Sequence, residues 1–395
     1  MGEKQLRTKQ MLPDHNSGSH PAPGSPEELM LFKKIQKGFS NDFELFFADK
    51  LASKTIVAIP SLTLDQLVLA KIDGALYYEE RLLCLLMLLR MPRTHVIYAS
   101  SMPIDPVIID YYLHLLPGIT GNHARERLTL LSCYDMSPVS LTEKLLHRTR
   151  LIERIKQSIP RKHVAHIACF NTTDFERTLA VRLGIPIYGC DPSLNYWGTK
   201  SGSRKIFLDA GVHMPPGAED LSTYEDIVHA VAALKDMYPG LKKAVIKMND
   251  GFSGDGNALL EYPKHVTSKE LFDWIHKNLY KEIIPVAKNM STETFLQKFR
   301  QMGGIVEAFI EGELKASPSV QCRINPMGEV DVISTHDQVL SGENGQVFVG
   351  AHFPSDESYR AEIGRLGKTI ATALKKKGVL GRFSIDFISV KENDA

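Results

Sequence analysis

A lysine followed by a glycine-rich segment is the first place where this sequence could do chemistry. Lys247 ends the apolar run AVIK, and residues 251–256 read GFSGDG. Backbone N–H groups in such a segment can approach an anion closely, because glycine has no side chain to hold the anion away. A second lysine, Lys200, stands just ahead of a predicted helix. Together these residues would suit the binding of phosphate groups.

The order of these residues excludes two common phosphate-binding motifs. A P-loop places its lysine after the glycines, whereas Lys247 precedes them. A dinucleotide-binding fingerprint requires a third glycine where Leu259 stands. The alternative interpretation of the segment is a plain β-hairpin with turns at Asp-Gly pairs, of which residues 250–251 and 255–256 are two.

A carboxylate, Glu307, stands inside the apolar strand pattern IVEAFIEG. A buried carboxylate is costly unless it receives hydrogen bonds. An amino group such as that of adenine could donate them. An ion pair with a nearby basic side chain is the alternative, and the sequence leaves both open.

The last predicted strand, RFSIDFISV, alternates apolar residues with Arg382, Ser384 and Asp386. Alternate residues of a strand share a face, so an acid, a hydroxyl and a guanidinium would lie together. Such a face suits a polar cleft that holds a metal ion and phosphate. A solvated edge strand would show the same pattern.

The patterns of the surrounding sequence predict a different fold for each half of the chain. Strand and helix patterns alternate through the first half of the chain, which indicates a parallel sheet covered on both faces and hence a Rossmann-like domain. Ser140 is a plausible cap for the second of its helices. The predicted strands are 55–60, 94–100, 127–133, 164–170 and 185–190, and the predicted helices are 104–116 and 141–159.

The second half changes organisation and is rich in strands that are not separated by regular helices. A helix over 201–210 ends at Gly211, which is a typical C-terminal glycine. Further helices are predicted at 223–238, 268–283 and 358–378, and the final strand lies within 381–390.

Composition limits the partners and the setting. Lys and Arg total 47 against 46 Asp and Glu, so no bulk charge favours nucleic acid or a membrane surface. Five cysteines without close spacing indicate neither disulfide framework nor zinc site, and favour a reducing, cytoplasmic setting. Residues 1–29 have the composition of a disordered arm. The apolar run 82–89 is too short for a membrane span and predicts a buried helix.

Over residues 196–395 the order of these motifs resembles the ATP-grasp superfamily. The resemblance is carried by Lys200 before the helix that leads to DAGVHMPPG, and by VIKMNDGFSGDGNALL, VEAFIEGE and GRFSIDF. The segments SPSVQCRI, STHDQVL and GAHFP resemble the pheganomycin-type peptide ligases and their uncharacterised relatives. The resemblance implies an α/β and α+β chain, with a Rossmann-like pre-ATP-grasp domain at 30–195 and a two-lobed ATP-grasp domain at 196–395, divided into lobes 196–304 and 305–395.

The resemblance also implies roles for individual residues. Lys200 and Lys247 would contact the phosphates of ATP, Glu307 would bind the adenine amino group, and Asp386 would hold Mg²⁺. Arg382 or Arg323 would stabilise an acyl phosphate. His336 could touch substrate, with a structural histidine as the alternative. The other implied nucleotide contacts are Gly251, Ser253, Gly254 and Gly256 in the covering loop, the backbone of Ile310, and Glu313 at the ribose.

The implied activity is ATP-dependent ligation of a small carboxylate to an amine, as in amino acids or peptides, through an acyl phosphate. A non-catalytic ATP-binding or scaffold module is the alternative, and a small-molecule kinase is a third. One departure bears on the choice, because ATP-grasp enzymes usually carry a second metal-binding Glu, with Asn two residues later, on a following strand. Here Glu392 and Asn393 are adjacent and would point to opposite faces. We therefore expect a fragment whose second lobe is incomplete, with a degenerate member that binds ATP weakly as the alternative.

Overall fold

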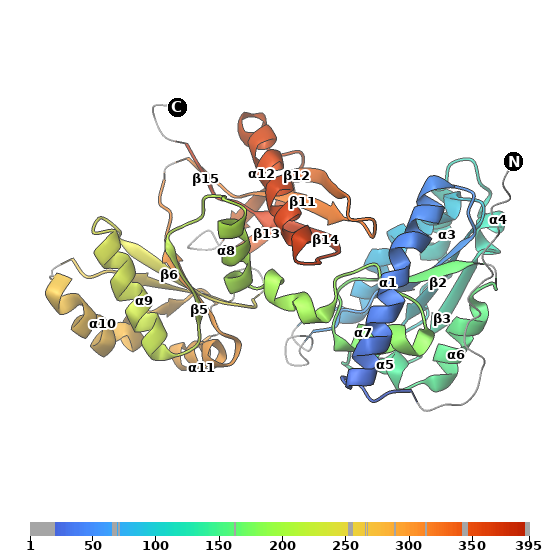
Figure 1. Ribbon diagram of the computed structural model, residues 1–395, viewed down its shortest axis with the longest axis horizontal. Helices are drawn as coiled ribbons and strands as arrows, with labels where there is room; N and C mark the ends of the chain where they lie inside the picture. The colour runs from blue at the N-terminus through green and yellow to red at the C-terminus, as the bar shows by residue number, and fades with distance from the viewer. Residues whose placement is uncertain are drawn as a thin grey trace, which may run out of the picture. The chain divides into compact units, whose positions relative to one another are not determined.

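A computed structural model describes residues 20–64, 69, 72–161, 163–251, 256–264, 266, 268–287, 290–312, 314–341 and 347–391. The chain forms two compact units, Met1–Pro192 and Ser193–Ala395 (Figure 1). Most of the expected disordered arm, residues 1–19, lies outside the described residues. Helix α1 (Pro26–Ala48) begins before the expected end of that arm at residue 29, because Ser25 caps it by accepting the N–H of Glu28 at 3.2 Å.

The first unit is built on a four-stranded parallel sheet with the order β3-β2-β1-β4. This order is that of a Rossmann-like sheet, as predicted. The expected strand at 185–190 forms only an isolated bridge between Ile167 and Ile187, since Pro186 has no N–H to continue the ladder. The four strands are β1 (Lys54–Ile59), β2 (Thr94–Ser100), β3 (Leu128–Ser132) and β4 (Val164–Cys169).

Helices cover both faces of this sheet. Alternate strand residues such as Val57 and Ile97 pack with α1, α5, α6 and α7. Their neighbours, such as Ala58 and Val96, pack with η1, α3 and α4 on the opposite face. The predicted helix 141–159 is divided in two, and its first part is capped by Ser140, which accepts the N–H of Glu143 at 3.3 Å. The elements are η1 (Ala75–Arg90), α3 (Pro106–His114), α4 (Gly121–Arg125), α5 (Leu141–Leu146), α6 (Thr149–Ser158) and α7 (Asp174–Leu183).

The apolar run 82–89 lies in η1, which is a 3₁₀ helix. Leu83, Leu86 and Leu89 are buried, three residues apart, which matches the three-residue turn of this helix type. A buried helix was expected here, and the structure buries one face of the segment in the core. Among the residues that the structure describes, no helix has the length and apolarity to span a membrane.

The second unit begins with a five-stranded sheet in the order β5-β9-β6-β7-β8, whose pairs are all antiparallel. Helices α9, α10 and α11 pack on one face, against residues such as Ala244 and Ile246. The intervening residues Val245 and Lys247 therefore lie on the other face. The elements are η2 (Pro192–Gly198), α8 (Lys200–Asp209), β5 (Gly217–Leu221), α9 (Tyr224–Met237), β6 (Lys243–Met248), β7 (Asn257–Glu261), α10 (Ser268–Glu282), β8 (Ile284–Pro285), α11 (Thr292–Met302) and β9 (Gly304–Ala308).

A second antiparallel sheet follows, in the order β13-β12-β11-β14, with α12 packed against it (Figure 1). The expected division between lobes at residues 304 and 305 falls inside β9. That strand pairs with β5 and β6, so it belongs to the first lobe. The remaining elements are β10 (Lys315–Ala316), β11 (Pro318–Ile324), β12 (Val330–Ser341), β13 (Val347–His352), α12 (Glu357–Lys376), β14 (Gly381–Asp386) and β15 (Ser389–Val390), with β10 and β15 paired to each other.

Candidate active site

Lys247 lies near the end of β6, just before the glycine-rich segment. Strands β6 and β7 pair as the predicted hairpin, with Lys247 opposite Asn257. The two described glycines of the connection pack backbone against backbone, since a Cβ added at Gly251 would lie 3.0 Å from Cα of Gly256. Bulkier residues would push these segments apart. The other two predicted contacts of this loop, Ser253 and Gly254, lie outside the described residues.

Glu307 is buried on β9 and lies opposite Val245 of β6, so its side chain shares a face with Lys247. Its Oε1 atom accepts from the ammonium of Lys247. Its Oε2 atom lies 3.2 Å from Nη1 of Arg204. The structure thus shows the ion pairing that the sequence left open as one of two interpretations of this carboxylate.

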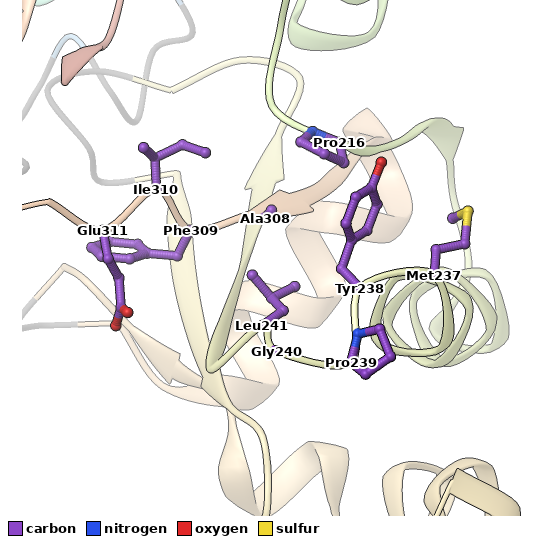
Figure 2. Close-up of a pocket in the computed structure, with 10 residues that line it drawn as sticks. All are labelled: Pro216, Met237, Tyr238, Pro239, Gly240, Leu241, Ala308, Phe309, Ile310 and Glu311. Carbon is purple, nitrogen blue, oxygen red and sulfur yellow. The ribbon is translucent and has the colours of Figure 1, made fainter. Parts of the chain in front are cut away.

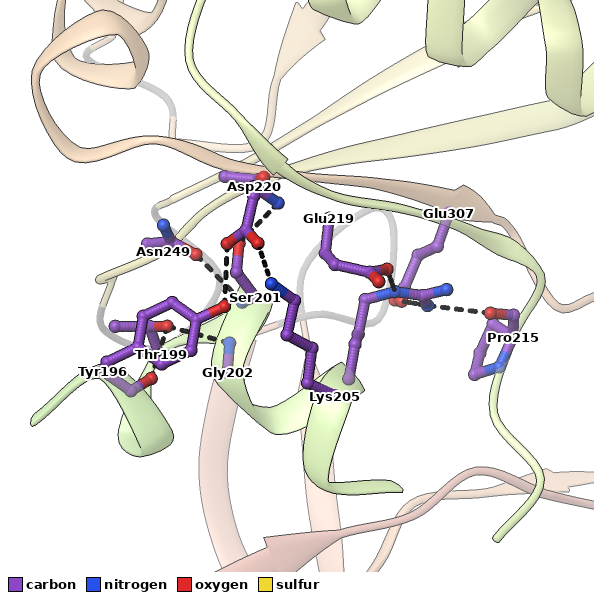
Figure 3. A network of polar contacts seen from close by, with 12 residues as sticks. Tyr196, Thr199, Ser201, Gly202, Lys205, Pro215, Glu219, Asp220, Asn249 and Glu307 are labelled. Carbon is purple, nitrogen blue, oxygen red and sulfur yellow. Dashed lines mark hydrogen bonds and ion pairs between the residues drawn. The ribbon is translucent and has the colours of Figure 1, made fainter. Parts of the chain in front are cut away.

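Arg204 is a member of the site that sequence reasoning missed. Its guanidinium donates to Oε2 of Glu219 at 3.0 Å and to the carbonyl of Pro215 at 2.8 Å, in addition to Glu307. Figure 3 labels these three partners, Pro215, Glu219 and Glu307, which lie close to one another. The available signal was spacing, because Arg204 follows Lys200 by one helical turn.

Helix α8 is fixed to the end of β6, which places Lys200 near Lys247. Asn249 accepts the N–H of Lys200 at 3.3 Å through its carbonyl and the N–H of Ser201 at 2.9 Å through its side chain. Thr199 caps the helix by accepting the N–H of Gly202 at 3.1 Å. The contacts of Asn249 with Ser201 and of Thr199 with Gly202 are seen in Figure 3.

The charges around Lys200 come from both sheets of this unit. Lys200 keeps an exposed surface, but protein surrounds its ammonium and removes part of its hydration. This desolvation, followed by repulsion from Lys247, lowers the pKa of Lys200. The carboxylates of Asp386, Glu307 and Asp250 act in the opposite direction, in that order. The structure therefore brings together both predicted lysines, Glu307 and Asp386.

Asp386 lies on the face of the second sheet that is turned away from α12. Ile385 packs in the core with α12, whereas Asp386 and Ser384 point to the other face, as their alternation predicts. The hydroxyl of Ser384 lies 3.3 Å from Oδ1 of Asp386. Ser319 stands between Asp386 and His336 in the register of three adjacent strands.

A cavity of about 340 Å³ opens on this face. Asp386 is the only carboxylate among the lining residues that the structure describes, and His336 lines the cavity too. Within the described ranges, no three His, Cys, Asp or Glu side chains gather so as to hold a metal ion. The residues lining the cavity are Ser319, Gln321, His336, Gln338, Phe348, Ala351, Ser384 and Asp386.

The two predicted catalytic arginines do not line this cavity. Arg323 and Arg382 are cross-strand neighbours on β11 and β14. This pair lies four residues along the strands from the pair Ser319 and Asp386. At the usual rise per strand residue, the backbones of the two pairs are about 13 Å apart. Arg323 also donates to Asp331 at 2.6 and 3.1 Å.

A larger cavity, of about 560 Å³, lies beside the segment after β9 (Figure 2). Ala308 and Leu241 line it, and Ala308 belongs to the core beneath α9. Because adjacent strand residues point to opposite faces, this cavity lies across β9 from the Glu307 side chain. Ile310 also lines it, and its carbonyl accepts from Nζ of Lys315 at 3.3 Å. Glu313, the expected ribose contact, lies outside the described residues.

Comparison with known sequences gives a family model for the second unit and relatives that match most of the chain. The family model described as "IQCH-like, ATP-grasp" matches residues 193–282 and 264–395. L-propargylglycine--L-glutamate ligase from Streptantibioticus cattleyicolor is 31% identical over 325 residues, which cover 80% of this chain and 64% of that protein. IQ motif-containing protein H from Danio rerio is 24% identical over 381 residues, covering 86% of this chain and 36% of that protein. The chain thus spans less than two thirds of the length of either relative.

Among solved structures, the biotin carboxylase of Campylobacter jejuni, described as a β-γ-ATP complex, shares the fold. Its TM-score is 0.52 at 15% sequence identity, and the match covers 86% of this chain and 63% of that one. The likeness confirms the predicted combination of a parallel α/β sheet with antiparallel α+β sheets.

Proposed function

Because this chain belongs to the IQCH-like ATP-grasp family, we propose that it is an ATP-dependent carboxylate–amine ligase. The observation that carries the proposal is that Lys200, Lys247 and Glu307 lie together beside the β5-β9-β6-β7-β8 sheet. The charge of Asp386, on the β13-β12-β11-β14 sheet, also acts on Lys200. Two like charges held close together favour an anion between them, because the anion removes their repulsion. We propose residues 196–395 as the catalytic domain and 30–195 as the domain that precedes it.

The described side chains fit a purine nucleotide with its phosphates. Lys200 and Lys247 would bind the phosphates, and the segment from Gly251 to Gly256 would cover them. Glu307 would accept from the adenine amino group. Bound ATP would supply the phosphoryl group that turns the substrate carboxylate into an acyl phosphate, and the amine would then attack the acyl carbon and displace inorganic phosphate. We also propose that the backbone of Ile310 contacts the adenine ring and that Glu313 contacts the ribose.

Asp386 would hold Mg²⁺ together with the phosphates. A single carboxylate supplies one or two of the six oxygen ligands that Mg²⁺ requires, so phosphate oxygens and water would complete the shell. The cavity of about 340 Å³ beside Asp386 would take the acceptor substrates. The name of the relative from Streptantibioticus cattleyicolor contains two amino acids, which supports amino acids or peptides as the substrate class. Arg382, or Arg323 after release from Asp331, would stabilise the acyl phosphate.

A hydroxylamine assay tests the reaction class directly. Hydroxylamine is a small amine that converts an acyl phosphate to a hydroxamate. The hydroxamate then forms a coloured complex with added iron(III). We expect ADP and hydroxamate to form together when the chain, Mg²⁺-ATP and hydroxylamine are mixed with a suitable amino acid or peptide from a panel. Lys247→Met should lower the yield of both products at limiting ATP, whereas Lys243→Met, which changes another lysine of β6, should retain them. Nucleotide binding without hydroxamate from any member of the panel would contradict a ligase.

A further inference from the structure

We propose that Arg204 is a positioning residue that fixes Glu307 for recognition of the 6-amino group of a purine nucleotide. The inference rests on the proposed function, because it takes Glu307 as the group that meets the purine base. Arg204 itself would touch neither the base nor the phosphates. Its part would be to set the orientation of the Glu307 carboxylate.

The first argument is that Arg204 is held rigidly. The Arg204 side chain is 5% exposed, and its guanidinium contacts Glu219, Glu307 and the Pro215 carbonyl. A planar guanidinium with three partners has little rotational freedom left.

The strand that carries Glu219 is itself fixed against β9. Gly217 of β5 lies opposite Glu307, and a Cβ added there would lie 2.1 Å from the carbonyl oxygen of Val306 and 2.7 Å from Cα of Glu307. The two backbones are thus in direct contact at this point. The anchors of Arg204 and the carboxylate it orients are parts of one tightly packed unit.

The second argument is that the two oxygens of Glu307 have unlike partners. Oε2 faces the buried Arg204, whereas Oε1 faces Lys247, whose side chain is 22% exposed. A lysine ammonium on its flexible four-carbon stem can turn toward another anion, and the anchored guanidinium cannot follow it. Lys247 is therefore the exchangeable partner of Glu307, and Arg204 is the permanent one.

The unlike partners of the two Glu307 oxygens determine which purine base this carboxylate would recognise. When Lys247 turns to a phosphate, Oε1 can accept a hydrogen bond, while Arg204 holds the carboxylate in place through Oε2. An ionised carboxylate has no proton to donate. It therefore accepts from the 6-amino group of adenine and repels the 6-oxo group of hypoxanthine. Without the guanidinium, the carboxylate could rotate away from the base, so the discrimination between the 6-amino and 6-oxo groups would be lost.

The test compares Mg²⁺-ATP with Mg²⁺-inosine triphosphate, which carries a 6-oxo group, by calorimetric titration of the full chain. The parent should prefer ATP, and Arg204→Gln should reduce that preference by about tenfold or more. Glu219→Gln keeps the guanidinium and removes one anchor, so it should reduce the preference in the same direction by a smaller factor. Lys205→Gln, which changes the next residue of α8, should leave the ratio of the two affinities unchanged.

The ratio separates a positioning role from a merely structural one. Equal losses of both affinities in Arg204→Gln, with the ratio preserved, would overturn the inference. If Arg204→Gln does not fold, Glu219→Gln decides, and an unchanged ratio there overturns it as well. A parent that binds neither nucleotide would refute the proposed function, whereas a parent that binds both equally would refute only the assignment of Glu307 to the base.

Discussion

Replacing Lys247 by Met tests the proposed phosphate contact with the smallest change of shape. Methionine keeps an unbranched apolar stem and removes the ammonium group. In the structure this ammonium contacts Oε1 of the buried Glu307. The replacement should therefore weaken nucleotide binding while Arg204 continues to neutralise the Glu307 carboxylate.

The size of the effect follows from the contact exchanged. A hydrogen bond to a charged group contributes about 1.5 to 3 kcal/mol. Lys247 gives up its contact with Glu307 when it reaches a phosphate, so the net loss should fall near the lower limit. A loss of about 1.5 kcal/mol corresponds to roughly a tenfold increase in the Kd for Mg²⁺-ATP.

Isothermal titration calorimetry of the parent and the variant measures this change. Lys243→Met is the matched control, because Lys243 lies on the same strand and its ammonium pairs with Glu261 and not with Glu307. Its affinity should equal that of the parent. Equal affinities for parent and Lys247→Met, in proteins with the same melting behaviour, would refute the placement of phosphate at Lys247.

Three further predictions concern the metal, the pH dependence and the backbone of the site. Asp386→Asn should reduce the dependence of ATP binding on Mg²⁺, and superimposable magnesium titrations of parent and variant would contradict this. A bound phosphate would raise the lowered pKa of Lys200, so nucleotide binding takes up a proton. The affinity for nucleotide should therefore fall as the pH rises through the lowered pKa of the free protein. Calorimetry across alkaline pH should show a weaker pH dependence of the affinity for Lys200→Met. Gly217→Ala should lower the stability by about 1 to 3 kcal/mol through overpacking, measured by chemical denaturation, because its Cβ would lie 2.1 Å from the Val306 carbonyl.

Patterns of period two predicted the strands of the site well. In β14 the alternation placed Asp386 and Ser384 on one face and Ile385 on the other, as the structure shows. In β11 the same alternation separates Gln321, which lines the cavity, from the buried Cys322. Such predictions succeed because the pleat of a strand fixes the direction of each side chain locally.

The predictions of helix continuity and helix type were wrong for two longer segments. The helix expected over 141–159 is interrupted between α5 and α6. The run of leucines at 82–89 forms 3₁₀ turns, although apolar composition alone favours an ordinary helix. Hydrophobic periodicity does not distinguish a continuous helix from two short ones with a shared buried face.

The partners within the site could not be read from the sequence, because they depend on strand register. Ser319 meets Asp386 and His336 only through the pairing of three strands. Glu219 reaches Arg204 only because β5 pairs with β9 in the observed register. A shift of one residue would turn each of these side chains to the opposite face.

The two interpretations of Glu307 that the sequence left open need not exclude each other. The carboxylate has one rigid cationic partner in Arg204 and one flexible partner in Lys247. An ATP molecule carries both an anion that competes for Lys247 and an amino group that could replace it at Oε1. A nucleotide would therefore exchange one ion pair for two new contacts and leave no buried charge unpaired. That exchange offsets much of the desolvation cost that a buried carboxylate would otherwise impose.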